Sequence, residues 1–446
     1  MVHQFSTVIF LGPGNDLCPL ITKKLPKFSL PVLNESLLDL NIKWIDPISD
    51  KIFIVVLEEL KDLVKNIVEN PKIEIITYQD YEGTYTVLRE ISSKLKDDVA
   101  IFKGDLIAKI DAVQISEKYW VSKNFLTVFA KKKKGIDLVG FKDNKLMYYH
   151  HDTTTFKGIS NKMILNNNKI SFSTKNEMLQ LYFLNKKHLN YDYDEFSFQT
   201  DILPLIVSRL KDTQPIEMAI FDENEILQIR SLKTYMDANF SFKNEREFDV
   251  YTENSSELCS EYINKNRVSF KGHKNESNTV TGTNLVVGEN SKITNSVIGK
   301  NVTIGINTKI KNSIIMDSVK IGSNCFFENC IVGHKAVVCD QVNITNCQIS
   351  YGYQFEGPIK AKKRGFIKFD PEDDKNVEVI GFTTKYLFED RDQENAKIQD
   401  CKKSENEENA DNKNVLDICK SKNIGLVDFI EPVDLSSNDS QQKCDK

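Results

Sequence analysis

A repeat of 17 residues constrains the fold more than any other feature of this chain. Between about residues 280 and 356, large apolar residues return at that spacing in three columns, which are six, five and six residues apart within one period. Glycine often occupies the second place of a hexad. Hexapeptide repeats of this kind are typical of a parallel β-helix, so each period predicts one triangular coil of three short strands. The columns are Val287, Ile304, Ile321 and Val338; Ile293, Ile310, Phe327 and Ile344; and Ile298, Ile315, Val332 and Ile349.

A fourth column of the repeat is polar and consists of asparagines. Asparagine tolerates left-handed backbone angles, and stacked asparagines hydrogen-bond to one another along the axis of such a structure. We therefore expect this column to hold one corner of the coils and not to form a binding site. Its members are Asn295, Asn312, Asn329 and Asn346, each followed by Ser or Cys.

Two further residues of the repeat carry reactive groups. Many hexapeptide-repeat proteins are acyltransferases that use a histidine of the coil, and His334 in VGHKAV is the candidate in this chain. It stands third in its hexad, an outward place, with no nearby His or carboxylate to orient it. We therefore expect a solvated, non-catalytic side chain. Cys325 belongs to the small residues that follow the large ones, and we expect it to pack inside the coil.

Bulk composition excludes several classes of protein. The chain has 446 residues, of which 40% are apolar, which is enough for two or three domains with cores of their own. A formal charge of -5 argues against binding nucleic acid through overall basicity. Nine cysteines form no C-x-x-C pair and no zinc spacing, which indicates a reducing compartment. We expect no export signal, no membrane span and a cytosolic location.

The region before the repeat alternates strand-like and helix-like segments. STVIFL, DKIFIVVL and DDVAIFKGDLI predict buried strands, with helices expected over residues 58–69 and 84–95. This alternation predicts an α/β domain with a mostly parallel sheet and with ligands at the carboxyl edge of that sheet.

The first predicted strand runs into FLGPGNDLCPL, which has the outline of a phosphate-binding loop. The loop contains Gly12 and Gly14, but Asp16 stands where phosphate chemistry needs a cation. A carboxylate at that place repels a phosphate. This loop therefore has the pattern of a relic.

Changes of composition divide the chain into parts. We predict an α/β domain over residues 1–245, which the resemblance described below makes nucleotidyltransferase-like, a linker over 246–280 and a β-helix over 281–365. Residues 389–446 carry 15 Asp and Glu against 9 Lys and Arg, which predicts a largely disordered acidic tail. Its apolar stretch IGLVDFI, residues 424–430, is a candidate docking segment.

The order of these motifs resembles the sugar-nucleotide pyrophosphorylases, whose glycine loop, P-K motif and metal-binding Asp precede a hexapeptide solenoid. More closely, it resembles a non-catalytic branch of that scaffold, the gamma subunits of eukaryotic translation initiation factor 2B. The resemblance covers residues 8 to about 365. It rests on GTYTVLREISSKLKDDVAIFKGDLI, on the lysine run before VGF, on LYFLNKK and on SLKTYMDANF.

The resemblance places the remains of a catalytic pocket. The loop Arg of the pyrophosphorylases falls on Asp16, the Lys of the P-K motif falls on Lys27, and the first magnesium ligand falls on Asp105. The second magnesium ligand falls on Gln228, and a neutral amide is a weak ligand for this ion. We expect no catalytic residue, metal or cofactor here. Lys27 and Asp105 then remain as an ion pair or scaffold, or keep a residual nucleotide site.

The sugar-binding N-A-G segment of the pyrophosphorylases falls roughly on Met178, Leu179 and Gln180, with no glycine for close backbone approach. The lysine run at residues 131–134 predicts a solvated loop between strands. Its alternative is an electrostatic contact with an acidic partner or RNA.

The resemblance implies a non-enzymatic subunit of the guanine-nucleotide exchange complex that acts on translation initiation factor 2. Its partners would be the epsilon subunit, the other subunits of factor 2B and factor 2 itself, without membrane or direct nucleic-acid contact. The alternative is an active sugar-nucleotide pyrophosphorylase, such as a mannose-1-phosphate guanylyltransferase. Asp16 and Gln228 argue against that alternative.

Overall fold

The computed structural model describes residues 4–12, 14, 17, 20–22, 25–79, 83–122, 125–155, 158, 170–189, 197–210, 214, 216–244 and 278–366. Four sequence predictions concern residues outside these ranges: the acidic tail 389–446, its segment 424–430, most of the linker 246–280, and Asp16. In the described ranges, no helix combines the length and the apolar character that crossing a membrane requires.

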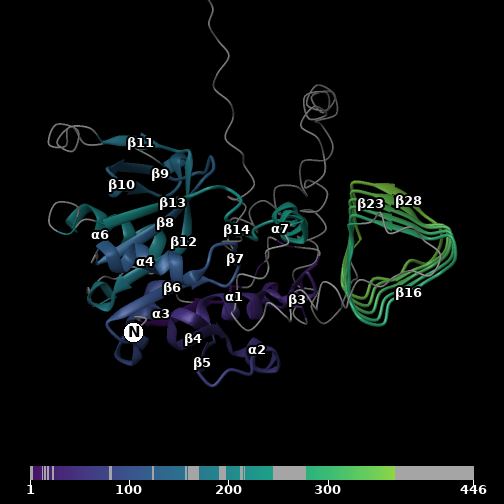
Figure 1. The fold of residues 1–446 in the computed structure, drawn as a ribbon, viewed down its shortest axis with the longest axis horizontal. Helices are drawn as coiled ribbons and strands as arrows, with labels where there is room; N and C mark the ends of the chain where they lie inside the picture. Colours follow the sequence, from purple (N-terminus) through teal and green to yellow (C-terminus); the bar gives the residue numbers. More distant parts are fainter. Residues whose placement is uncertain are drawn as a thin grey trace, which may run out of the picture. The chain divides into compact units, whose positions relative to one another are not determined.

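The N-terminal part is built on one ten-stranded sheet, in the order β11-β9-β10-β13-β8-β12-β6-β1-β4-β5 (Figure 1). Strands β6, β1, β4 and β5 are parallel, while β12 runs antiparallel to both β6 and β8. The sheet is therefore parallel along one half and mixed along the other. Its strands are β1 Phe5–Phe10, β4 Ser49–Leu57, β5 Ile73–Tyr78, β6 Asp98–Lys103, β8 Leu126–Lys132, β9 Leu138–Lys142, β10 Lys145–His150, β11 Ser171–Ser173, β12 Asn176–Asn185 and β13 Ile216–Phe221.

Helices cover both faces of the sheet because its central strands are apolar on both sides. In β1, Val8 belongs to one core cluster and its neighbour Ile9 to the other, as the alternation of a strand requires. Residues of α3 and α6 pack in the first cluster, and residues of α1, α2 and α4 pack in the second. These helices are α1 Leu37–Ile45, α2 Lys61–Ile67, α3 Thr84–Ile91, α4 Ala112–Ser122 and α6 Leu203–Leu210.

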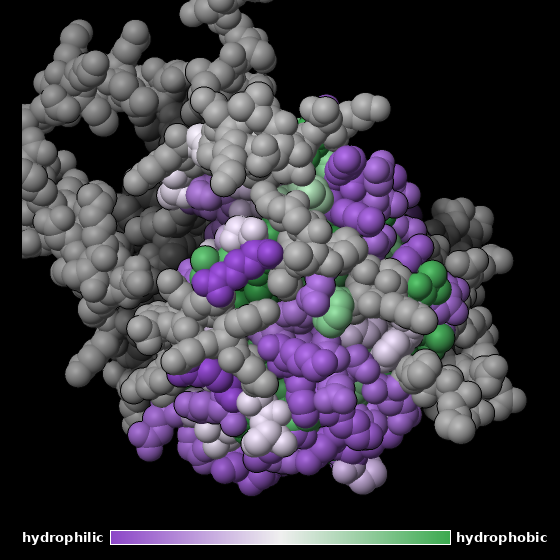
Figure 2. Space-filling model, turned by 90° about the vertical axis from the view of Figure 1, so that its left-hand side faces the viewer, coloured by the Kyte–Doolittle hydropathy of each residue, from purple (hydrophilic) through white to green (hydrophobic). Residues whose placement is uncertain are grey.

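The side of the molecule that faces left in Figure 1 is mainly hydrophilic. Figure 2 shows apolar groups there only as small separate spots among the residues that are coloured. The apolar residues of the sheet are thus gathered in its two core clusters, as expected for an α/β domain.

Two small β-ribbons and one helix complete this part of the chain. β7 (Leu106–Ala108) pairs antiparallel with β14 (Ile226–Gln228), and β2 (Pro31–Val32) pairs with β3 (Glu35–Ser36). Helix α7 (Leu232–Asn244) follows β14, and the hydroxyl of its Tyr235 donates a hydrogen bond to the Pro31 carbonyl at 2.5 Å. The first ribbon matters for the site, because it joins the segment after β6 to the segment before α7.

Residues 278–366 form three-sided coils, and the triangular outline is visible in Figure 1. Each coil contributes one strand to each of three parallel sheets, and paired residues are 17 apart, as for Ile293 and Ile310. The three predicted apolar columns point inward and form one core cluster. The sheets are β15 Val280–Thr281, β18 Val297–Ile298, β21 Ile314–Ile315, β24 Ile331–Val332, β27 Gln348–Ile349 and β29 Gly365–Phe366; β16 Val286–Val287, β19 Thr303–Ile304, β22 Lys320–Ile321 and β25 Val337–Val338; and β17 Lys292–Thr294, β20 Lys309–Lys311, β23 Phe326–Glu328, β26 Asn343–Thr345 and β28 Lys360–Lys362.

The corners of the coils explain the asparagines. All four members of the predicted column have positive φ, with 52° at Asn329. The side chain of Asn295 donates to Asn312 at 2.8 Å. Two further corner columns also have positive φ, and sequence reasoning missed them although they follow the same spacing. Their members are Asn284, Asn301, Ser318 and Lys335 for one corner, and Asn290, Asn307, Asn324 and Gln341 for the other.

Candidate functional site

The glycine loop lies directly against the lysine that follows it. Gly14 has φ of +76°, and a β-carbon built on it would lie 2.4 Å from the β-carbon of Lys27. Glycine is therefore required at this point for both conformation and space. Lys27 opens a short 3-10 turn, Lys27–Ser29, between the loop and β2. Gly12 begins the same loop, with open space where a side chain would be.

Lys27 and Asp105 form a buried ion pair. The Lys27 Nζ donates to Asp105 Oδ2 at 3.0 Å, and only 10% of each side chain is exposed. Burial raises the pKa of Asp105, but Lys27, Arg230 and Lys103 together outweigh it and hold that pKa below its usual value. The carboxylate is thus ionised and compensated by a lysine of the same chain.

Gln228 lies beside this pair because of the small ribbon. Its strand partner is Leu106, the residue after Asp105, and the next residue, Ile229, donates its backbone N–H to the Asp105 carbonyl at 2.8 Å. Gln228 is 2% exposed. Neither atom of its amide has a hydrogen-bond partner in the described part of the chain, and the same is true of Asp105 Oδ1.

The side chains of Asp105 and Gln228 do not match the magnesium site of the pyrophosphorylases, which needs two carboxylates. The site offers one carboxylate, already neutralised by Lys27, and one neutral amide. Within the described ranges, no group of three or more His, Cys, Asp and Glu side chains is arranged to hold a metal ion. The structure brings together Gly14, Lys27, Asp105 and Gln228, as the resemblance implies, while Asp16 is outside the described residues.

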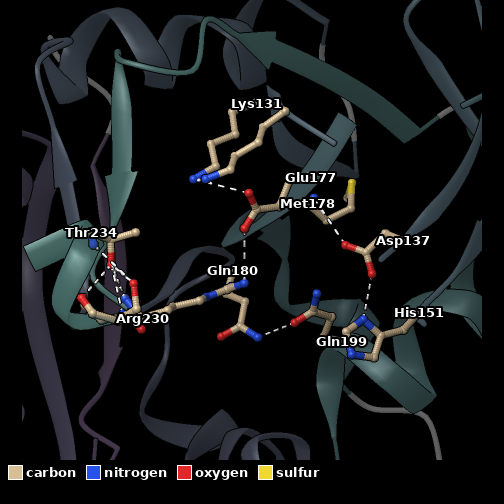
Figure 3. A network of polar contacts seen from close by, with 12 residues as sticks. Lys131, Asp137, His151, Glu177, Met178, Gln180, Gln199, Arg230 and Thr234 are labelled. Atoms are coloured by element: carbon tan, nitrogen blue, oxygen red, sulfur yellow. Dashed lines mark hydrogen bonds and ion pairs between the residues drawn. The ribbon is translucent and has the colours of Figure 1, made fainter. Parts of the chain in front are cut away.

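A second charged group adjoins the pocket, and sequence reasoning missed it. Arg230 stands two residues after Gln228 and donates to Glu177 Oε1 at 3.3 Å, while Lys131 Nζ lies 3.4 Å from Glu177 Oε2 (Figure 3). Arg230 Nη2 has no hydrogen-bond partner among the described residues. One carboxylate of β12 is therefore held between two cations from β8 and from the segment after β14.

The prediction of a solvated loop for the lysine run is wrong for its first two members. Lys131 and Lys132 belong to strand β8. Lys131 is 4% exposed, since the alternation of the strand points it to the inner side where Glu177 neutralises it. Burial lowers the pKa of Lys131, and Glu177 partly offsets that shift. The sequence could have indicated this position. If the preceding strand extends into the lysine run, its alternation places neighbouring lysines on opposite faces of the sheet.

A third polar group follows along β12. Gln180 donates to Gln199, and the Gln199 amide donates to the Tyr149 hydroxyl at 3.0 Å. Asp137 binds His151 Nδ1 at 2.7 Å and accepts the backbone N–H of Met178 at 3.2 Å (Figure 3). At the positions matched to the sugar-binding N-A-G segment, the Gln180 side chain and the Met178 backbone N–H thus bond within the protein.

The surroundings of His334 differ from the sequence prediction. Its side chain is only 14% exposed, and Nδ1 lies 3.9 Å from Asp317 Oδ2 of the preceding coil. Burial lowers the pKa of His334, while Asp317 opposes the shift. The carboxylate was missed because it is 17 residues away in sequence but adjacent in the stacked coils. Cys325 is buried, as predicted, and its thiol donates to the Cys339 carbonyl at 3.2 Å.

Comparison with known proteins supports the assignment of the β-helix. Residues 260–359 match the family model described as the LbH domain of EIF2B subunit epsilon, where LbH denotes a left-handed β-helix. The predicted fold class is confirmed: a nucleotidyltransferase-like α/β domain precedes a left-handed parallel β-helix.

Curated relatives share shorter stretches with this chain. The bifunctional protein GlmU of Methanococcus maripaludis strain C7 is 31% identical over 112 residues, which is 25% of this chain and 27% of that protein. GlmU of M. maripaludis strain C5 is 32% identical over 100 residues, and GlmU of Methanococcus aeolicus is 28% identical over 110. The chain thus spans about a quarter of the length of the relatives that it matches.

Proposed function

We propose that this protein is a non-catalytic subunit of a guanine-nucleotide exchange complex that returns translation initiation factor 2 from its GDP form to its GTP form. In this proposal it corresponds to the gamma subunit of factor 2B and works in the cytosol. The observation that carries the proposal is the buried pair of Lys27 and Asp105. The cation and the carboxylate that a pyrophosphorylase directs at phosphate and magnesium are here bonded to each other.

Phosphoryl transfer depends mainly on positioning and on cations that neutralise developing charge. A pocket in which Asp16 replaces a loop cation and Gln228 replaces a metal ligand lacks two such groups. Loss of one preorganised stabilising group costs about 3 to 4 kcal/mol of barrier, so two losses leave little turnover. The scaffold then keeps its shape for another purpose.

That purpose, in our proposal, is pairing with the epsilon subunit. The match of the β-helix to the epsilon LbH model supports this choice, because two chains of one architecture pack through equivalent surfaces in a pseudo-symmetric pair. We expect such an interface to be of the obligate class, about 2,000 Å² or more. The GlmU relatives favour the alternative, an active sugar-nucleotide pyrophosphorylase, because their likeness points to nucleotidyltransferase ancestry.

Coexpression tests the proposal. The chain alone should be poorly soluble or self-associated, and coexpression with epsilon should give a stable complex. This complex should exchange GDP on factor 2 faster than epsilon alone. The double variant Lys27→Met/Asp105→Leu, which removes both charges, should retain the stimulation. A well-behaved monomer that neither binds epsilon nor changes the exchange rate would refute the proposal.

A further inference from the structure

One of the three sheets of the β-helix carries lysines on the outer side of its first two strands and of its last strand. The sheet consists of β17, β20, β23, β26 and β28, and its inward residues, such as Ile310 and Phe327, are buried. The outward residues stack in register because each coil repeats the last. We call this surface the lysine face. Its positive members are Lys292, Lys309, Lys311, Lys360 and Lys362, all exposed.

The other two sheets differ from the lysine face. On the sheet of β18, β21 and β24, the outward residues Val297, Ile314 and Ile331 are buried in a cluster that also contains Tyr235 of α7. The strands of the remaining sheet contain a single lysine, Lys320. Residues 278–366 hold ten Lys and Arg and five Asp and Glu, and half of these cations are on the lysine face. Half of the positive charges of the β-helix therefore lie on one of its three sheets, although the whole chain has a formal charge of -5.

The lysine face already holds one carboxylate. Glu328 in β23 accepts from Lys311 Nζ of the neighbouring coil at 2.8 Å, with 29% of its side chain exposed. In the described part of the chain, Lys292, Lys309, Lys360 and Lys362 have no ion pair of this kind. Glu328 thus shows how a carboxylate fits this surface, and four further cations remain available to carboxylates from another chain.

We propose that the lysine face binds an acidic segment of a partner protein in extended conformation. Lys360 and Lys362 stand two residues apart on strand β28, a separation of about 6.6 Å, which alternate carboxylates of an extended peptide also have. The strands of the face have paired backbones, so contact is made by side chains.

Two observations favour an acidic peptide over RNA. The five cations are all lysines, whereas arginine is the residue that pairs with phosphate in a bidentate way. The strands of the face contain two aromatic residues, of which Phe327 points inward and Phe326 is half-buried, so a row of stacking platforms for bases is lacking. The proposal does not depend on the exchange function proposed above.

Binding of a fluorescently labelled peptide of alternating glutamate and serine to the full chain tests this inference by fluorescence anisotropy. The variant Lys309→Glu/Lys360→Glu reverses two charges on the lysine face. The control Lys300→Glu/Lys320→Glu makes the same change of net charge on exposed residues elsewhere in the β-helix. We expect the face variant to weaken binding about tenfold or more and the control about twofold or less, with binding weakened by salt.

Absence of peptide binding at low salt would overturn the proposal, and so would equal weakening of binding in both variants. Oligouridylate serves as the RNA probe. If it binds the wild type more tightly than the peptide does, and if this binding is lost in the face variant, the proposal is also overturned. Circular dichroism checks that both variants are folded. If the reversal unfolds the β-helix, Lys309→Gln/Lys360→Gln takes its place, and peptide binding as tight as that of the wild type would then count against the proposal.

Discussion

Removing one member of the Lys27–Asp105 pair should destabilise the N-terminal domain strongly. Asp105→Ala removes the carboxylate that lies 3.0 Å from the buried Lys27 ammonium, and Lys27→Ala removes the ammonium that pairs with the buried Asp105 carboxylate. Replacing both residues by apolar side chains of similar size, as in Lys27→Met/Asp105→Leu, removes the need for compensation. The single variants should therefore cost far more stability than the double variant.

The structure sets the size of this effect. At 3.0 Å, with the effective dielectric constant near 20 that suits such sites, the attraction is about 5.5 kcal/mol. Desolvation of two groups that are each 10% exposed consumes much of that attraction in the intact pair. A single variant loses the attraction but still bears the desolvation cost of the remaining charge. We therefore expect its free energy of unfolding to fall by about 3 to 5 kcal/mol. The double variant should change stability by about 1 kcal/mol or less.

Urea denaturation followed by tryptophan fluorescence measures these differences, because Trp44 and Trp120 both belong to the N-terminal domain. The pKa of Asp105 is lowered on folding, so its contribution is present above about pH 4 and is lost as the pH falls through the lowered value. The wild type should therefore lose stability relative to the double variant in acid. Single variants that cost less than about 1 kcal/mol would refute the structural role of the pair.

Three other changes follow from the structure. Asn329→Leu forces a branched side chain into φ of 52° and should cost the β-helix about 1 to 3 kcal/mol in thermal denaturation, whereas Asn329→Gly should keep most of the stability. Since burial lowers the pKa of His334, the β-helix should lose stability as the pH falls below about 6.5, and melting curves of His334→Gln should lack this dependence. Lys131→Met leaves Glu177 paired with Arg230, whereas Lys131→Glu places two carboxylates together, so the first variant should destabilise the domain less than the second. Equal melting midpoints of the two variants would contradict the buried position of Lys131.

The β-helix was predictable from the sequence because its period is local and repeats. Each apolar column of 17-residue spacing became one inward row of the core, and the asparagine column became a corner. The pair of His334 and Asp317 was not predicted, although the same spacing separates the two residues. Residues one period apart are neighbours in stacked coils, so polar residues should have been compared at that spacing as well.

The pocket of the N-terminal domain was located by resemblance, and its chemistry was not fully predicted. An ion pair of Lys27 and Asp105 was one of the alternatives left open, and the structure forms it; the two residues are 78 apart, so no local pattern decided between the alternatives. Glu177, Arg230 and Lys131 come from three different segments, so their contact depends on the register of β12 against β8, where Glu177 lies opposite Lys131. The order of strands in a sheet is a tertiary property, and local periodicity does not determine it.

Turnover of a sugar 1-phosphate with a nucleoside triphosphate and magnesium tests the central claim most directly. We propose that this protein keeps the pyrophosphorylase scaffold without its chemistry. The purified chain, with or without the epsilon subunit, should therefore form no sugar nucleotide above the rate of a blank. Magnesium-dependent turnover that disappears in the folded double variant Lys27→Met/Asp105→Leu would contradict this proposal and would identify an active nucleotidyltransferase.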